Sequence, residues 1–127
     1  MCNYNDDIKR LNNLRAKGHV LIKGYKILSM ARDGTASIRS SCFPHFNWEK
    51  GWNYARTPSG NKMIRTKPYP KNTQVNHSIH VYKTRPRYIG LYDIVQPVWY
   101  YADEVTSYDS CHIITVSKVL IKTLKDK

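Results

Sequence analysis

The sequence predicts a single α+β domain over residues 1–127, mostly antiparallel β-sheet, with a short N-terminal helix and a long basic loop. The length is sufficient for one modest hydrophobic core but not for two independent ones. A segment near the N-terminus has apolar residues at helical spacing. Separate short runs rich in β-branched and aromatic residues follow it, and turn residues divide them. Such runs of strands beside few helices favour an antiparallel sheet over a wound parallel one.

The helix is expected within residues 3–17. Ile8, Leu11 and Leu14 recur at helical spacing, and Asn5 or Asp6 could cap the first turn. Gly18 follows, at the place where glycine commonly ends a helix. We therefore expect a short helix that covers one side of the sheet.

Residues 19–41 predict a β-hairpin. Its first strand would be residues 19–30, HVLIKGYKILSM, with Gly24 at a bulge or bend. The Asp-Gly pair at 33–34 is typical of a tight turn between two strands. Residues 35–41 would form the returning strand.

Further strands are predicted later in the chain. Residues 78–84, SIHVYKT, have the composition of a strand, and a short helix could open between Thr84 and Pro86 and reach Val95. Residues 98–121 are expected to supply the C-terminal strands. The longest β-branched run, residues 112–120, predicts a central strand.

Residues 50–92 are unusual because they contain nine Lys and Arg residues and no Asp or Glu. Within this stretch, residues 55–76 are rich in turn-forming residues and predict a long irregular loop, which in a small domain is commonly functional or mobile. Residues 62–67 could add a short strand to it. The cations expected to contact phosphate or an acidic partner are Lys50, Arg56, Lys62, Arg65, Lys67, Lys71, Lys83, Arg85 and Arg87. The aromatic residues expected to stack on bases are Trp52, Tyr69 and Tyr82.

The net charge of +12, from 21 Lys and Arg against nine Asp and Glu, indicates an anionic partner. Cations mixed with flat aromatic rings favour nucleic acid or a nucleoprotein complex, and an acidic protein surface is an alternative. A membrane is not expected, because no apolar run approaches the length of a spanning helix. Three widely spaced cysteines and an N-terminus without an apolar signal segment favour a cytoplasmic protein.

Metal and cofactor sites are not expected. His77 and His80 form a His-x-x-His pair, but in a strand their side chains would point to opposite faces. The carboxylates are few, so we expect binding and not turnover. If the protein were an enzyme acting on nucleotide or nucleic acid, the candidate acid–base residues would be His80, Tyr82 and Glu104.

Three short segments resemble small uncharacterised phage and bacterial accessory proteins. YKIL at 25–28 matches their Tyr-Lys-hydrophobic start, NWEKGW at 47–52 their aromatic-x-x-Gly middle, and IHVY at 79–82 their hydrophobic-His-Val-Tyr strand. The resemblance implies no activity. It suggests a phage-encoded modulator or inhibitor of host defence or transcription, acting in the host cytoplasm either on nucleic acid or as a protein-only inhibitor.

Overall fold

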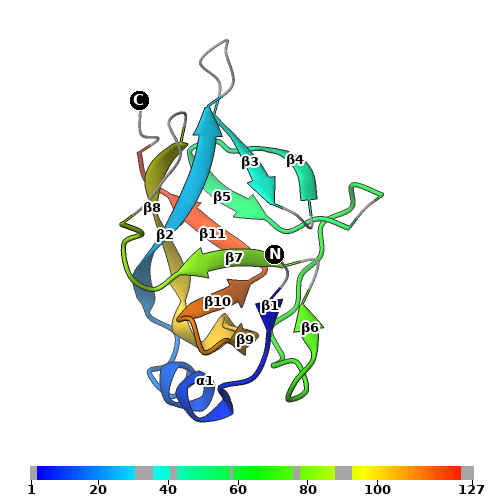
Figure 1. Ribbon diagram of the computed structural model, residues 1–127, viewed down its shortest axis with the longest axis vertical. Helices are drawn as coiled ribbons and strands as arrows, with labels where there is room; N and C mark the ends of the chain where they lie inside the picture. The colour runs from blue at the N-terminus through cyan, green and yellow to red at the C-terminus, as the bar shows by residue number, and fades with distance from the viewer. Residues whose placement is uncertain are drawn as a thin grey trace.

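The computed structural model describes residues 3–30, 36–40, 43–57, 59–75, 78–87 and 93–123, which form a curled antiparallel sheet with one α-helix at one end (Figure 1). The elements are β1 (Asn3–Tyr4), α1 (Ile8–Arg15), β2 (Leu21–Met30), β3 (Ala36–Ser40), β4 (Phe43–Asn47), β5 (Gly51–Tyr54), β6 (Gln74–Val75), β7 (Ile79–Tyr82), β8 (Asp93–Tyr101), a 3₁₀ turn η1 (Ala102–Glu104), β9 (Ser107–Tyr108), β10 (Ile113–Val116) and β11 (Lys118–Ile121). No helix in the described ranges is long and apolar enough to cross a membrane.

The main sheet has nine strands, in the order β5-β11-β8-β2-β7-β10-β9, with β3 paired to β2 and β4 paired to β3. β1 and β6 form a separate two-stranded sheet. β10 and β11 are consecutive in the chain with only Ser117 between them, yet β8, β2 and β7 separate them in the sheet. The sheet therefore has to curl until its distant strands meet, which gives it a barrel-like shape.

The core fills the inside of this curled sheet. Alternate residues of each strand point inward, so Val98 and Tyr100 of β8 and Val119 and Ile121 of β11 are almost fully buried. Leu11 and Leu14 of α1 join the same cluster and close one end of it. The predicted antiparallel sheet is confirmed, although the fold is more strongly β than expected.

The helix is shorter than the predicted 3–17. Asn3 and Tyr4 pair with β6, and the eight residues of α1 begin after Asp7, whose side chain caps the helix by accepting from the Arg10 amide. The predicted caps, Asn5 and Asp6, are both wrong, because the helix begins at Ile8 and Asp7 directly precedes it. The Asn5 side chain bonds elsewhere. Its Nδ2 donates to the Tyr69 carbonyl, and its Oδ1 accepts from the Tyr108 amide.

The predicted hairpin is present, since β2 and β3 pair antiparallel through Ser29 with Ser37. The expected turn at residues 32–34 lies outside the described residues. The expected bulge at Gly24 is wrong, because the pairing of β2 with β8 continues without a shift through Gly24 and Val98. Gly24 instead allows close packing, since a Cβ there would collide with Val81 Cγ1.

The run of residues 112–120 is not one central strand. The chain breaks at Ser117 into β10, which pairs with β7 and β9, and β11, which pairs with β5 and β8. The Ser117 side chain stabilises the chain at this break, because its hydroxyl accepts from the Arg65 amide at 2.7 Å and donates to the Arg65 carbonyl at 2.8 Å. β-branched composition predicted strand structure correctly but not its division between two ladders.

The basic stretch 50–92 contains β5, β6 and β7. Between β5 and β6, the described residues form one β-bridge, Arg56 with Lys62, and the short strand predicted at 62–67 is not formed. Hydrogen bonds hold this segment against the sheet, including Tyr69 N to the Thr106 carbonyl and Asn72 N to the Asn5 carbonyl. The helix predicted after Thr84 is absent from the described residues 84–87, and β8 already begins at Asp93.

Candidate functional site

Two tryptophans lie in one row across the outer side of the sheet. Trp52 of β5 pairs with Leu120 of β11, Leu120 pairs with Trp99 of β8, and Trp99 pairs with Lys23 of β2. Directly paired residues point to the same side of a sheet, so these four side chains are neighbours. Each is half-buried or exposed, while their strand neighbours Asn53, Val98 and Val119 are buried.

The rows on either side have the same character. Tyr54 pairs with Lys118, and Tyr101 pairs with Leu21. Tyr25 lies two residues beyond Lys23 and is also half-buried. We refer to these outward side chains together as the aromatic face, which consists of Leu21, Lys23, Tyr25, Trp52, Tyr54, Trp99, Tyr101, Lys118, Leu120 and Lys122.

Lysine ammonium groups lie over the rings of the aromatic face. Lys122 Nζ is 4.3 Å from the centroid of Trp99, and Lys23 Nζ approaches the same ring from β2. Lys118 Nζ is 4.8 Å from Trp52 and 5.5 Å from Tyr101. Strand residues 21–25, 51–54, 97–101 and 118–121 contain no Asp or Glu. The face is therefore both aromatic and positively charged.

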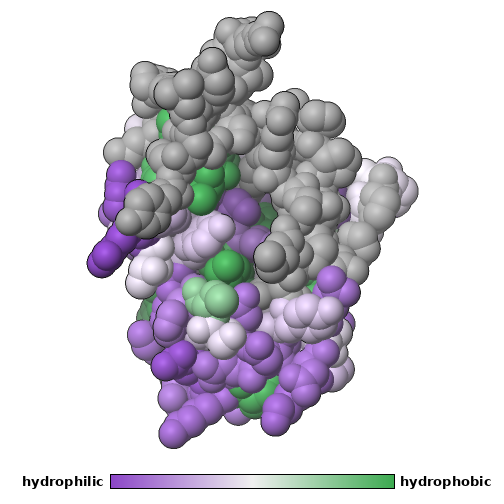
Figure 2. Space-filling view, in the orientation of Figure 1, coloured by the Kyte–Doolittle hydropathy of each residue, from purple (hydrophilic) through white to green (hydrophobic). Residues whose placement is uncertain are grey.

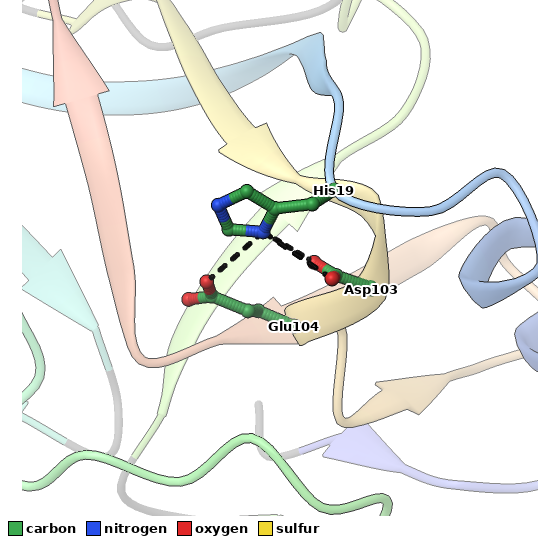
Figure 3. A group of neighbouring side chains, drawn as sticks. All are labelled: His19, Asp103 and Glu104. Carbon is green, nitrogen blue, oxygen red and sulfur yellow. Dashed lines mark hydrogen bonds and ion pairs between the residues drawn. The ribbon is translucent and has the colours of Figure 1, made fainter.

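His19 closes one end of the aromatic face (Figure 3). Its ring stacks on Tyr101 at a centroid distance of 3.7 Å, and Tyr101 in turn stacks on Trp52 at 5.6 Å. His19 Nδ1 lies 3.0 Å from Asp103 Oδ1 and 3.7 Å from Glu104 Oε2. Figure 3 shows Nδ1 directed at both carboxylates and the other ring nitrogen pointing away from them. The two carboxylates thus orient an imidazole that extends the line of stacked rings.

The same three side chains form a candidate metal site, the one such group found among the described residues. One ligand atom from each of His19, Asp103 and Glu104 lies within 4.8 Å of the others. An imidazole nitrogen with carboxylate oxygens suits a divalent cation. The contacts are equally those of an ion pair, and Lys118 Nζ lies 3.9 Å from Glu104 Oε1, where its charge would repel a bound cation. The sequence analysis did not find this cluster because 84 residues separate His19 from Asp103.

The predicted cations are spread over several surfaces. Lys62 reaches the aromatic face, since its Nζ lies 4.3 Å from the Tyr54 centroid, and Lys50 immediately precedes β5. Lys83 faces a different part of the molecule, beside Tyr108. The other predicted cations are exposed or half-buried outside the rows of the aromatic face: Arg56, Arg65, Lys67, Lys71, Arg85 and Arg87.

Of the predicted stacking residues, Trp52 lies on the aromatic face. Tyr69 lies elsewhere, with the Arg65 guanidinium 4.0 Å from its ring and its hydroxyl 3.4 Å from Ser78 Oγ. Tyr82 of β7 is half-buried and pairs with Tyr25 at the margin of the face.

The three acid–base candidates have different surroundings. Burial, with a smaller contribution from the Lys26 charge, lowers the pKa of His80 to about 4, so this imidazole is uncharged at neutral pH. Its Nε2 is buried and has no hydrogen-bond partner among the described residues. Glu104 makes its ion-pair contacts with His19 and Lys118. Within the described ranges, the structure therefore does not pair His80 with Glu104 for proton transfer.

Five residues of the aromatic face were not predicted as binding residues: Lys23, Trp99, Tyr101, Lys118 and Lys122. The prediction depended on the local density of cations and rings, whereas these residues come from three distant segments. Alternation within each strand was the available signal, since Trp99 and Tyr101 alternate with the apolar Val98 and the buried Tyr100. The alternation of buried and outward residues along a strand predicts which side chains face outward, but it does not predict which strands lie beside them.

The chain matches no protein-family model, no curated protein and no solved structure.

Proposed function

We propose that the protein binds single-stranded nucleic acid, with unpaired bases stacked on the aromatic face and phosphates contacted by its lysines. The observation that carries this proposal is the row Trp52–Leu120–Trp99–Lys23, in which two half-buried indoles alternate with an aliphatic side chain and a cation. A sheet surface of this kind is suited to splayed bases, since every base has an aromatic face that can stack. Bases inside a duplex are already stacked and cannot reach such a surface.

The lysines over the rings do not oppose this proposal. An exposed cation–π contact contributes about 0.5–1 kcal/mol, whereas a stacked base contributes about 1–3 kcal/mol. A base can therefore displace Lys118 or Lys122 from its ring with a net gain. Both ammonium groups lie at the ends of flexible side chains, so each could then move to a nearby phosphate, where charge attraction adds to binding.

The cations of residues 55–76 would extend the electrostatic surface. Lys62 already lies at its edge, over Tyr54. We expect the exposed Arg56, Lys67 and Lys71 to strengthen binding through charge alone, with little dependence on the bases. The mixture of cations and aromatic rings is what favours nucleic acid or a nucleoprotein complex as the partner.

The proposal is tested by fluorescence anisotropy with labelled oligo(dT) and oligo(U) of about 12 nucleotides, a length within the range that small β-domains occupy. Binding should weaken strongly between about 50 and about 200 mM salt. Duplex DNA of the same length should bind more weakly than either single strand. Comparison of the two oligonucleotides shows whether DNA or RNA is preferred.

An abasic strand of the same length is the decisive control, because it keeps every phosphate and lacks every base. Stacking predicts that the abasic strand binds much more weakly than oligo(dT) and that Trp52→Ala reduces the difference. Equal binding of the two strands would leave only a general attraction to polyanions. That result would contradict the proposal and favour an acidic protein surface as the partner.

A further inference from the structure

A second basic surface lies between α1 and the ends of β7 and β9. There the structure has a pocket of about 260 Å³, lined by Arg10, Asn13, Leu14, Lys17, Lys83 and Tyr108. Arg10, Asn13 and Leu14 are spaced i, i+3 and i+4 on one side of α1, and Lys17 lies in the turn that follows the helix. Hydrophilic residues cover most of the lower part of the molecule, around α1 (Figure 2).

The pocket concentrates positive charge around an apolar floor. Arg10, Lys17 and Lys83 line it, and no carboxylate does. Asp7 is the carboxylate paired with Arg10, at 3.3 Å. Burial, and then the charges of Lys17 and Arg10, lower the pKa of Lys83 below its usual value. A bound anion would relieve this repulsion.

The wall opposite α1 is held in place by a tight turn. Asp109 Oδ1 accepts from the amides of Cys111 and Ile113, and His112 adopts the left-handed conformation with φ 62°. In this position the His112 carbonyl accepts from the Lys83 amide at 3.1 Å. Lys83 Nζ lies 5.4 Å from the Tyr108 ring centroid. The backbone that carries Lys83 is therefore tied to this turn.

We propose that this pocket binds a phosphate monoester, separately from the aromatic face. A monoester carries close to two negative charges at neutral pH and three acceptor oxygens, which suits three cations and the Asn13 amide. Leu14 and Tyr108 also line the pocket, but both are almost fully buried and offer a ligand little surface. The volume lies below the range of about 300–1,000 Å³ that drug-sized ligands occupy, so the pocket suits the phosphate group itself, with the rest of the ligand outside it.

The test is a ¹H–¹⁵N NMR titration of the full chain with inorganic phosphate, and with acetate at equal ionic strength. Phosphate should shift the amides of Asn13, Lys17 and Lys83, and acetate should not. Phosphate affinity should fall as the pH drops below about 6, where the dianion takes up a proton. Lys83→Gln should weaken phosphate binding about tenfold or more, as expected for the loss of a hydrogen bond to a charged group.

Lys17→Gln provides a second variant, because Lys17 is exposed and its loss should not disturb folding. Lys9→Gln is the matched control, since Lys9 is an exposed lysine of α1 that does not line the pocket. Shifts spread evenly over surface lysines, equal effects of acetate, or unchanged binding by both pocket variants would overturn the proposal.

The source of the phosphate is determined with AMP and with a 5′-phosphorylated oligonucleotide, each against its 5′-hydroxyl counterpart. Phosphate-dependent shifts at the pocket with AMP support a free mononucleotide, and such shifts with the oligonucleotide alone support a strand end. If neither phosphorylated probe shifts the pocket amides, the proposal is overturned. Trp99→Ala keeps the two proposals distinct, because it should weaken oligonucleotide stacking and leave the response to inorganic phosphate unchanged.

Discussion

Lys23 of β2 and Trp99 of β8 face each other across the antiparallel ladder, with the Lys23 ammonium 5.8 Å from the indole centroid. Lys122 approaches the same ring to 4.3 Å from the end of β11. Three strands that are distant in the sequence thus place two cations around one half-buried indole. This arrangement makes Trp99 the residue on which base stacking can be tested most directly.

Trp99→Ala should lower the affinity for oligo(dT) by about 5- to 150-fold, which corresponds to the loss of about 1–3 kcal/mol for one stacked base. Trp99→Phe should recover part of the loss, since it restores a smaller ring. Fluorescence anisotropy at fixed salt measures both. Tyr4→Ala is the matched control, because Tyr4 is an exposed aromatic residue on the separate β1–β6 sheet. An equal loss in Trp99→Ala and Tyr4→Ala would count against stacking on this face.

Gly24→Ala should destabilise the fold by about 1–3 kcal/mol, the usual effect of overpacking a core. A Cβ at this position would collide with Val81 Cγ1 and lie 3.1 Å from Tyr100 Cε1. Urea denaturation measures the loss in the free energy of unfolding. The double variant Gly24→Ala/Val81→Ala should lose less than the sum of the two single variants, because Val81→Ala makes room for the new methyl group. If the losses of the two single variants simply add in the double variant, the close approach of β2 and β7 at Gly24 is not the cause of the destabilisation.

Lys26→Met should stabilise the protein at pH 7. Lys26 is 7% exposed, and burial lowers its pKa from 10.5 to about 8, so at neutral pH a charge is held in the core near Trp48. Between about pH 8 and 10.5 the unfolded chain binds a proton that the folded chain has released, so the stability of the unsubstituted protein should rise with pH.

This rise should be smaller in Lys26→Met, where the lowered pKa of Lys83 still contributes, and undiminished in Lys9→Met, in which an exposed lysine is replaced. Urea denaturation at pH 7, 9 and 10.5, compared between the variants, isolates the contribution of Lys26 from that of the other titrating groups. If Lys26→Met is less stable than the unsubstituted protein at pH 7, the Lys26–Trp48 contact outweighs the cost of burying the charge.

Asn5→Ala should cost about 1–3 kcal/mol for each polar group that it leaves without a partner. Asn5 is fully buried, and its side chain bonds the Tyr69 carbonyl at 2.6 Å and the Tyr108 amide at 3.1 Å. Amide hydrogen exchange should therefore quicken most at Tyr108, whose amide loses its acceptor. The Asn72 amide keeps the backbone carbonyl of residue 5 as its acceptor and should be less affected. Asn12→Ala, at an exposed position of α1, should leave exchange at both sites unchanged.

Composition and alternation predicted much of the local structure. The spacing of Leu11 and Leu14 indicated α1, and both residues are buried as expected. Alternation and β-branched residues indicated β2, β7 and the later strands. The boundaries were less well predicted where a side chain serves a distant partner. Asn5 and Ser117 are the clearest cases, since each bonds a segment more than 50 residues away.

The sequence by itself determined the character of the protein: a strongly basic, tyrosine-rich chain that forms an antiparallel sheet with a short helix against it. These properties depend on charge and on the period of side chains along one strand, which can be counted locally. The tertiary structure decided where the cations and rings meet. Trp52, Trp99 and Lys23 become neighbours only through the pairing of β5, β11, β8 and β2.

Arg10, Lys17 and Lys83 likewise become neighbours only when α1 packs beside the end of β7. Strand register and helix docking depend on the burial of the whole core, to which Leu28, Val81 and Ile114 contribute from three different strands. The pattern of residues within one segment does not show which other segments will pack against it. The expectation of an anionic partner came from composition, whereas the two surfaces proposed to bind it are products of the folded structure.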